Sequence, residues 1–236
     1  MHKIKLVQPV VDTANEAFKR RRARTRIFET IDSARTAHVI VDLQNGFMEP
    51  GAAVELPVAR EIVPNVNEIS RAVRAFGGIN IFLHYTARDE AIASWSTWYS
   101  HFHDADSREM MRKAFAPNAR SWNLWPGLEV TDEDIKLEKS RFSAFVPGTC
   151  DLHSVLQSRK IENVIITGAA TNVCCESTAR DAMQLNYKVI FVADGNAALT
   201  DDFHNASLNN LRSLYADIAM TESVVRQLAE GAQRST

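Results

Sequence analysis

Two patterns of hydrophobic and polar positions alternate along the chain. Short runs rich in apolar residues predict buried β-strands, and longer stretches with apolar residues at helical spacing predict α-helices. The predicted strands are 38–43, 79–85, 134–139, 162–168, 187–194 and 217–221. The predicted helices are 58–77, 149–160, 172–186, 201–214 and a last one from Thr221. This alternation predicts a three-layer α/β/α fold of the Rossmann type, with a mainly parallel central sheet covered on both faces.

The first 36 residues differ from the rest, because they contain a dense basic cluster. Its members are Lys19, Arg20, Arg21, Arg22, Arg24 and Arg26. A solvated arm or a subunit contact explains the cluster more simply than nucleic-acid binding, since no aromatic residues interleave with these charges. We therefore divide the chain into an N-terminal arm, 1–36, and one α/β domain, 37–236. Residues 86–134 are polar and rich in Trp and His, and we expect short helices and loops there, beside a site.

Composition excludes several classes of protein. The net charge of −2 gives no indication of a nucleic acid or an anionic membrane as partner. No apolar run approaches the ~18 residues of a membrane span, and no secretory signal is recognisable. The three cysteines are an odd number and two of them are adjacent, which argues against a disulfide framework. We expect a cytoplasmic protein in a reducing setting.

Three polar residues follow predicted strands and would meet at the carboxyl edge of the sheet. Asp42 and Lys139 each end a strand, and Cys174 follows another through the Gly168 loop. Each residue taken alone has an ordinary explanation. The acid is typical of a turn cap, the lysine of a solvated surface, and the cysteine of a small buried side chain. The pattern alone therefore leaves a catalytic and a structural interpretation open.

Three segments resemble the signature segments of the isochorismatase-like cysteine hydrolases, in order and spacing. They are VIVDLQNGFMEPGA (39–52), LEKSRFSAF (137–145) and VIITGAATNVCCESTARDA (164–182). The resemblance covers about residues 37–228 and implies a catalytic triad of Asp42, Lys139 and Cys174. Thr171 stands three residues before Cys174, as in the family pattern, and so selects the first of the two cysteines. The resemblance also implies a cis peptide at Ala169-Ala170 and an oxyanion hole formed by the Ala170 and Cys174 N–H groups.

The chemistry suits these residue types. A helix start and the Lys139 ammonium should favour the Cys174 thiolate, and Asp42 can accept the thiol proton and return it to a leaving nitrogen. Cys175 lies about 100° around the helix from Cys174, in a stripe with Ala179 and Ala182. We expect Cys175 to pack against the sheet, where most family members carry Val.

Several further residues are candidates for substrate binding. They are Gln44, Phe47, Arg141, Phe142 and Asn172. Three aromatic residues, Trp95, Trp98 and Tyr99, could line a pocket for a planar ligand or seal a subunit contact. Nicotinamidases of this family carry a metal site with two histidines, and His84, His101 and His103 are the candidates for it here. The D-x-H spacing of such ligands is not evident in this sequence. We expect no metal and no cofactor.

The resemblance implies a cysteine-dependent hydrolase that cleaves a C–N amide or carbamoyl bond of a small metabolite through a thioester acyl-enzyme. The amino-acid sequence of the signature segments is most similar to that of ureidoacrylate-type members. Alternatives are an isochorismatase, which cleaves a vinyl ether to give pyruvate, a nicotinamidase-like amidase, and a scaffold that has lost activity. Family habit implies a homodimer or homotetramer. The substrate itself is not specified by the sequence.

Overall fold

The computed structural model of the chain describes residues 1–6, 26–52 and 54–234. The basic residues Lys19, Arg20, Arg21, Arg22 and Arg24 lie outside the described residues. Arg26 lies inside them, and its guanidinium donates to Ser223 Oγ in the last helix, α10 (Thr221–Arg234). The described end of the predicted arm therefore contacts the body of the domain.

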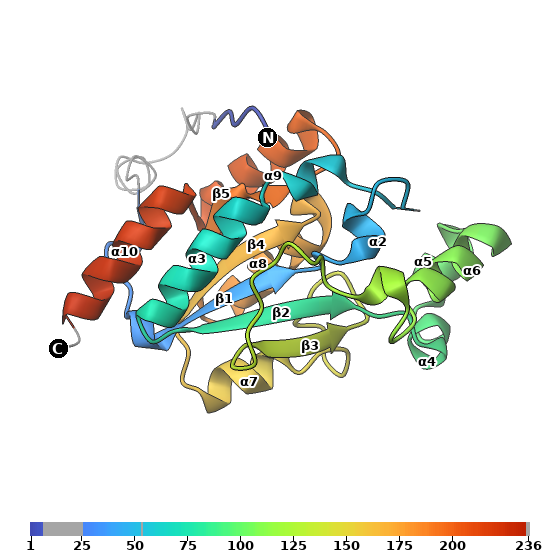
Figure 1. Cartoon of the computed structure of the whole chain (residues 1–236), viewed down its shortest axis with the longest axis horizontal. Helices are drawn as coiled ribbons and strands as arrows, with labels where there is room; N and C mark the ends of the chain where they lie inside the picture. Colours follow the sequence, from blue (N-terminus) through green and yellow to red (C-terminus); the bar gives the residue numbers. More distant parts are fainter. Residues whose placement is uncertain (7–25, 53, 235–236) are drawn as a thin grey trace.

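A six-stranded sheet forms the middle layer (Figure 1). Its strands are β1 Thr36–Val41, β2 Ile79–Tyr85, β3 Ile135–Lys139, β4 Asn163–Ala169, β5 Lys188–Ala197 and β6 Asp217–Ala219. They lie in the order β3-β2-β1-β4-β5-β6, and every neighbouring pair is parallel. The strand order reverses between β1 and β4, and the carboxyl ends of these two strands flank the usual ligand position in such sheets.

Helices cover both faces of the sheet and confirm the three-layer prediction. The helices are α2 Asn45–Met48, α3 Val63–Ala75, α4 Asp89–Ala93, α5 Ser96–His101, α6 Ala105–Ala114, α7 Leu152–Ser158, α8 Glu176–Gln184, α9 Asp201–Leu214 and α10. α3 and α10 pack on one face, and α7, α8 and α9 pack on the other (Figure 1). Three 3₁₀ turns connect elements: η1 Ser33–Arg35, η2 Pro57–Arg60 and η3 Arg120–Trp122.

Successive residues of the buried strands supply two separate cores. Val39 and Val41 lie in one apolar cluster with residues of α7, α8 and α9, and Ile40 lies in the other, with residues near the start of α3. Because side chains alternate across a strand, a strand that is covered on both faces is buried at every position. The six residues of β1 are all buried, as this arrangement requires.

The segment that follows β2 lies beyond the carboxyl ends of the strands. α4, α5 and α6 sit past the arrowheads of β2 and β3 (Figure 1). Their buried residues form a cluster that contains Tyr85, Tyr99, Met111 and Phe115. The prediction of short helices and loops over 86–134 is therefore confirmed. No helix among the described residues combines the length and apolarity needed to cross a membrane.

Candidate active site

Asp42, Lys139 and Cys174 come together at the carboxyl edge of the sheet. Asp42 follows β1, Lys139 ends β3, and Cys174 follows β4. Lys139 Nζ lies 2.7 Å from Asp42 Oδ2, and both side chains are almost completely buried. Cys174 is 7% exposed and lies within hydrogen-bonding reach of both partners, each of which influences its titration. The three residues are distant in sequence, and the parallel sheet brings them to one place.

Gln44 fixes the backbone around Asp42. Its Oε1 accepts from the Tyr85 N–H at 2.8 Å, and its Nε2 donates to the carbonyls of Tyr85 (3.1 Å) and Trp122 (2.8 Å). Asp42 has φ 54, a left-handed conformation that is uncommon outside glycine. The Asp42 carbonyl accepts from the Gln44 N–H at 2.9 Å. Gln44, predicted as a substrate-binding candidate, thus ties the end of β1 to the end of β2.

Lys139 is held in place by its backbone neighbours and by Tyr85. Its Nζ donates to the Arg141 carbonyl at 3.0 Å and lies 5.3 Å from the centre of the Tyr85 ring. Burial lowers the pKa of the Lys139 ammonium, but the negative charges of Asp42 and Cys174 more than offset this, so the pKa is raised above its usual value. Lys139 therefore remains a cation throughout the neutral range.

The backbone around Cys174 forms a π-helical turn, Thr171–Cys175, that runs directly into α8. The Ala170 carbonyl accepts from the Val173 N–H at 3.0 Å and from the Cys175 N–H at 3.2 Å. In a regular α-helix the Cys174 N–H would donate to the Ala170 carbonyl. Among the described residues this hydrogen bond is missing. The Cys174 N–H therefore does not share the Ala170 carbonyl with its two neighbours. The preceding peptide bond, Ala169-Ala170, is cis.

Gly168 allows β4 to lie against the end of β1. Its φ is +129, and a Cβ added there would overlap the Val41 carbonyl oxygen. Gly168 pairs with Val41, the residue immediately before Asp42. A glycine is required here because no other residue has both this backbone conformation and this lack of a side chain. The close contact brings the π-helical turn that carries Cys174 next to Asp42.

Burial dominates the protonation of the Cys174 thiol. It raises the pKa of Cys174 above the usual thiol value, although the Lys139 charge opposes it, and the Asp42 charge raises the pKa further. Burial also raises the pKa of Asp42, with Lys139 as the main opposing influence. One ammonium can balance one anion, so Asp42 and Cys174 share a single acidic proton. Lys139 favours the thiolate as expected, but burial and the Asp42 charge outweigh it, so the pKa of the Cys174 thiol stays above its usual value.

Cys175 belongs to the core and not to the site. It is fully buried in the apolar cluster that contains Ala179 and Ala182. Burial raises the pKa of its thiol well above the usual value, and the nearby Cys174 and Asp42 charges act in the same direction. The prediction that Cys175 packs against the sheet is confirmed.

A cavity of about 270 Å³ lies beside Cys174. Its lining residues are Phe47, Val54, Tyr85, Trp98, His103, Met111, Phe142, Ala170, Val173 and Cys174. Phe47 and Phe142 were substrate-binding candidates from the sequence. Trp98 also lines the cavity, while Trp95 packs edge-on against Phe142 and Tyr99 bonds to the Tyr85 hydroxyl at 2.6 Å. Phe47, Trp98 and Phe142 thus line the cavity, and Trp95 and Tyr99 pack behind the lining residues.

The structure places two other candidates away from this wall. Arg141 donates to the carbonyls of Ser140 and Ser94 and to Ser94 Oγ, and its guanidinium lies 4.9 Å from the Trp95 ring centre. Asn172 is half-buried and does not belong to the described residues that line the cavity. The lining residues that the sequence did not suggest are Val54, Tyr85, Met111, Val173 and His103. Val54, Tyr85, Met111 and Val173 are of types typical of core, and the sequence suggested His103 only in connection with a metal site, so no sequence signal placed these residues at the cavity.

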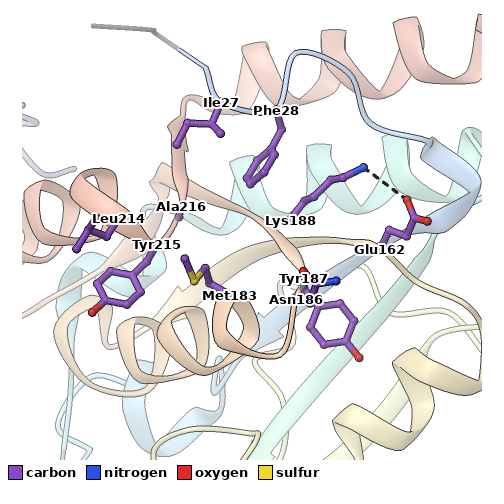
Figure 2. A pocket seen from close by; sticks show the side chains of 10 residues that line it. All are labelled: Ile27, Phe28, Glu162, Met183, Asn186, Tyr187, Lys188, Leu214, Tyr215 and Ala216. Carbon is purple, nitrogen blue, oxygen red and sulfur yellow. Dashed lines mark hydrogen bonds and ion pairs between the residues drawn. The ribbon is translucent and has the colours of Figure 1, made fainter. Parts of the chain in front are cut away.

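A larger cavity, of about 550 Å³, lies at the opposite edge of the sheet (Figure 2). Glu162 precedes β4, Lys188 begins β5, and Ala216 precedes β6, so this cavity is at the amino ends of these strands. Figure 2 shows apolar side chains around it, with a Glu162–Lys188 ion pair of 3.5 Å on one side. It contains none of the three catalytic candidates. The smaller cavity beside Cys174 is therefore the candidate active site.

The fold and the position of this cavity define an α/β enzyme of the doubly wound class, with its site at the switch point of the sheet. The family model described as isochorismatase domain matches residues 36–223. The chain therefore belongs to the isochorismatase family, and the protein is a hydrolase.

Solved structures of similar proteins agree with this family. A cysteine hydrolase from Pseudomonas syringae pv. phaseolicola 1448A is 26% identical, with a TM-score of 0.77 over 85% of this chain and 95% of its own. An isochorismatase-like hydrolase from Alkaliphilus metalliredigens is 27% identical, with a TM-score of 0.67 over 81% of this chain and 97% of its own. The pyrazinamidase of Pyrococcus horikoshii, in complex with zinc, shares the fold at 22% identity, with a TM-score of 0.66 over 79% of this chain and 99% of its own.

The described residues contain no cluster of side chains suited to a metal ion. Within residues 1–6, 26–52 and 54–234, no group of three or more His, Cys, Asp and Glu side chains could hold a metal ion. His84 is buried and stacks on Trp122, with ring centres 4.4 Å apart. Burial lowers the pKa of His84 to about 4. His84 therefore has a packing role next to the site.

Proposed function

We propose that the protein hydrolyses a C–N amide or carbamoyl bond of a small metabolite, with Cys174 as nucleophile and a thioester acyl-enzyme as intermediate. The observation that carries the proposal is the buried Lys139–Asp42 pair, 2.7 Å long, beside a cysteine that lines a cavity. Membership of the isochorismatase family and similarity to a cysteine hydrolase support the same chemistry.

Attack begins with transfer of the Cys174 proton to Asp42. The raised pKa of the Asp42 carboxyl makes it a stronger base than an exposed aspartate and brings it closer to the thiol in proton affinity. The thiolate Sγ then attacks the substrate carbonyl carbon, and the C=O electron pair moves to the oxygen. Lys139 keeps its charge and balances whichever of the two acidic groups is ionised.

The developing oxyanion needs hydrogen-bond donors that are already in position. The Cys174 N–H, which does not donate to the Ala170 carbonyl, is suited to this role, and the Ala170 N–H is its proposed partner. As the tetrahedral intermediate collapses, Asp42 gives its proton to the leaving nitrogen. Ammonia or an amine departs, and the acyl group remains on Cys174 as a thioester.

Water completes the cycle. Asp42, now ionised again, takes a proton from the water molecule that attacks the thioester carbonyl. Collapse of the second intermediate breaks the C–S bond and returns that proton to the Cys174 sulfur, which releases the carboxylic acid. The same carboxylate thus acts as base and acid in both halves of the reaction, as a two-step acyl transfer requires.

A panel of small amides and ureido compounds tests this function, with ammonia release as the readout. We expect ammonia from at least one amide, with loss of the activity in Cys174→Ala. Pyruvate release from isochorismate without cleavage of any amide would favour the isochorismatase alternative. An EDTA-treated sample serves as a control, and we expect it to keep its activity because the described residues hold no metal cluster.

A further inference from the structure

We propose that the acyl group of the substrate is compact, apolar and uncharged, such as a single aromatic ring or a branched hydrocarbon, and that substrates with a carboxylate on this group are rejected. The inference rests on the proposed amide hydrolysis and specifies its substrate class. It follows from the wall of the cavity beside Cys174, which carbon atoms of aromatic and aliphatic side chains dominate.

The size of the cavity limits the acyl group. Its volume is about 270 Å³. A cavity of about 150 Å³ in another protein holds a benzene molecule, so this cavity has room for one ring with its carboxamide and a short substituent. Phe47, Trp98 and Phe142 offer flat surfaces on which a planar ring can pack.

The polar atoms of the aromatic wall are turned to other partners or are inaccessible. The Tyr85 hydroxyl bonds to the Tyr99 hydroxyl at 2.6 Å. Trp98 Nε1 and His103 Nε2 are buried and have no hydrogen-bond partner among the described residues. The two rings pack edge to face, with centres 4.7 Å apart. The wall therefore presents mainly ring carbons to a ligand, and its ionisable side chains are Tyr85, His103 and Cys174.

The cations nearest the cavity are already engaged. Lys139 pairs with Asp42 at 2.7 Å, and Arg141 is held by the Ser140 and Ser94 carbonyls and by the Trp95 ring. A substrate carboxylate in this cavity would lose its hydration and gain no ion pair, which is strongly unfavourable. An uncharged apolar group gains free energy in the same position.

A neighbouring polar depression does not change this conclusion. It has a volume of about 430 Å³ and is lined by residues that include Thr86, Arg88, Glu138 and Lys139. Arg88 there makes a bidentate ion pair with Glu138. Cys174 is not among its lining residues. An acyl group bound in this depression would be separated from the nucleophile, so the apolar cavity is the one that selects it.

Two compounds of the same shape test the inference: 4-nitrobenzamide and 4-carbamoylbenzoate. The nitro group and the carboxylate are similar in shape and differ in charge. We expect kcat/KM for ammonia release to be at least about 100-fold higher for 4-nitrobenzamide, because the carboxylate is desolvated without a partner. Equal or better cleavage of 4-carbamoylbenzoate would overturn the inference and leave the proposed amide hydrolysis intact.

A binding measurement keeps the inference testable without turnover. Protection of Cys174 against iodoacetamide, followed by peptide mass, should be at least about tenfold more effective with 4-nitrobenzamide than with 4-carbamoylbenzoate at equal concentration. Better protection by the carboxylate, lost in His103→Gln, would show that His103 binds an anion and that the inference is wrong. Pyruvate release from isochorismate alone would remove both the inference and the proposed function.

Charged variants provide the matched control. Val54 lines the cavity and is half-buried, so a lysine there can reach its rim. We expect Val54→Lys to raise kcat/KM for 4-carbamoylbenzoate relative to 4-nitrobenzamide by roughly tenfold, through an ion pair with the carboxylate. Leu199→Lys adds the same charge at a position that is 65% exposed and outside the cavity, and should leave the ratio unchanged. An equal shift in both variants, or none in Val54→Lys, would contradict the account.

Discussion

Cys174 and Cys175 are adjacent in sequence, but their side chains have different surroundings. Cys174 lines the cavity and lies beside Lys139 and Asp42, whereas Cys175 is enclosed by the core under α8. Burial raises the pKa of both thiols, so acidity alone does not separate them. What separates them is access to a ligand and to a base, and both favour Cys174.

Substitution of each cysteine should therefore have a different effect. We expect Cys174→Ala to abolish amide hydrolysis, because no neighbouring side chain can replace the sulfur. Cys175→Val exchanges one buried apolar side chain for another of similar volume, at a cost in stability below about 1.5 kcal/mol. Ammonia release and thermal unfolding measure the two effects. A Cys175→Val variant that is folded but inactive would contradict this division of roles.

The charges around Cys174 predict an unusual result for Asp42→Asn. Loss of the base should abolish turnover. Loss of the Asp42 charge should also lower the pKa of the Cys174 thiol, because that charge raises it and Lys139 would then be free to balance the thiolate. We expect alkylation of Cys174 by iodoacetamide at pH 7.5 to become roughly tenfold faster. Peptide mass spectrometry measures this rate.

Lys139→Met is the matched opposite change. It removes the one positive charge that lowers the pKa of Cys174, so alkylation should become slower than in the unmodified protein. Circular dichroism checks that both variants are folded, because each leaves a buried charge without its partner. Slower alkylation in Asp42→Asn, with the fold retained, would show that Asp42 does not act on this thiol as described.

At the scale of elements, the site depends on how β1 and β4 end. The close approach at Gly168 and Val41 places the π-helical turn Thr171–Cys175 beside Asp42, and this turn carries Cys174 at the cavity. The apolar pattern predicted a helix over 172–186, so a helix start was expected near Cys174. The π-helical hydrogen bonds could not be predicted, because they depend on how the chain leaves β4.

Gly168→Ala tests the contact between these strands. The added methyl group would overlap the Val41 carbonyl oxygen, in a backbone conformation that alanine rarely adopts. We expect a loss of roughly 3 kcal/mol in the free energy of unfolding, or failure to fold. Gly51→Ala is the control, since Gly51 has φ +80 but no atom within 4 Å of the added carbon, and should cost about 1 kcal/mol. Equal losses in urea titrations of the two variants would refute the steric argument.

Most strands and helices could be predicted from their apolar patterns. The bounds of β2 and α9 agree with the prediction, whereas β1 begins and ends two residues earlier than expected. The difference at β1 arises because Thr36 and Ala37 are buried in the sheet, and because Asp42 leaves the extended conformation. A sequence pattern cannot show where a strand stops when polar and apolar residues are both buried.

At the scale of the whole molecule, the doubly wound topology was predictable and the cavity was not. Parallel strands bring Asp42, Lys139 and Cys174 to one edge, which the signature segments indicated. The cavity wall instead joins Val54, His103 and Met111, which come from a loop, from the turn between α5 and α6, and from α6. Their meeting depends on the packing of short helices that have no repeated pattern, so a sequence alone does not specify it.

Asp134 should contribute to stability in a pH-dependent way. It lies before β3, and its side chain is 2% exposed and paired with Arg74 of α3 at 2.7 Å. Burial raises the pKa of Asp134, but hydrogen bonds from Arg74, Thr131 and Asn80 outweigh this and lower it below the usual value. A depressed carboxyl pKa stabilises the fold above the unfolded-state pKa of about 4, and this contribution is lost as the pH falls through the folded-state value.

We therefore expect Asp134→Asn to lose about 2 kcal/mol in the free energy of unfolding at pH 7 and much less at the acid end of the range. Urea titrations between pH 3 and pH 7 measure the difference. Glu129→Gln is the control, because its ion pair with Arg71 is about half exposed on both sides and should have a barely measurable effect. A loss that is independent of pH would show that the carboxylate charge is not the stabilising feature.

The central claim is that Cys174 carries the acyl group of an amide substrate. Rapid acid quenching during turnover of 4-nitrobenzamide, followed by digestion and peptide mass spectrometry, tests it most directly. The account predicts a mass increase equal to the substrate less ammonia, located on Cys174, reversed by hydroxylamine and absent from Cys174→Ala. Acylation of Cys175 or of any other residue instead, or normal turnover by Cys174→Ala, would contradict it.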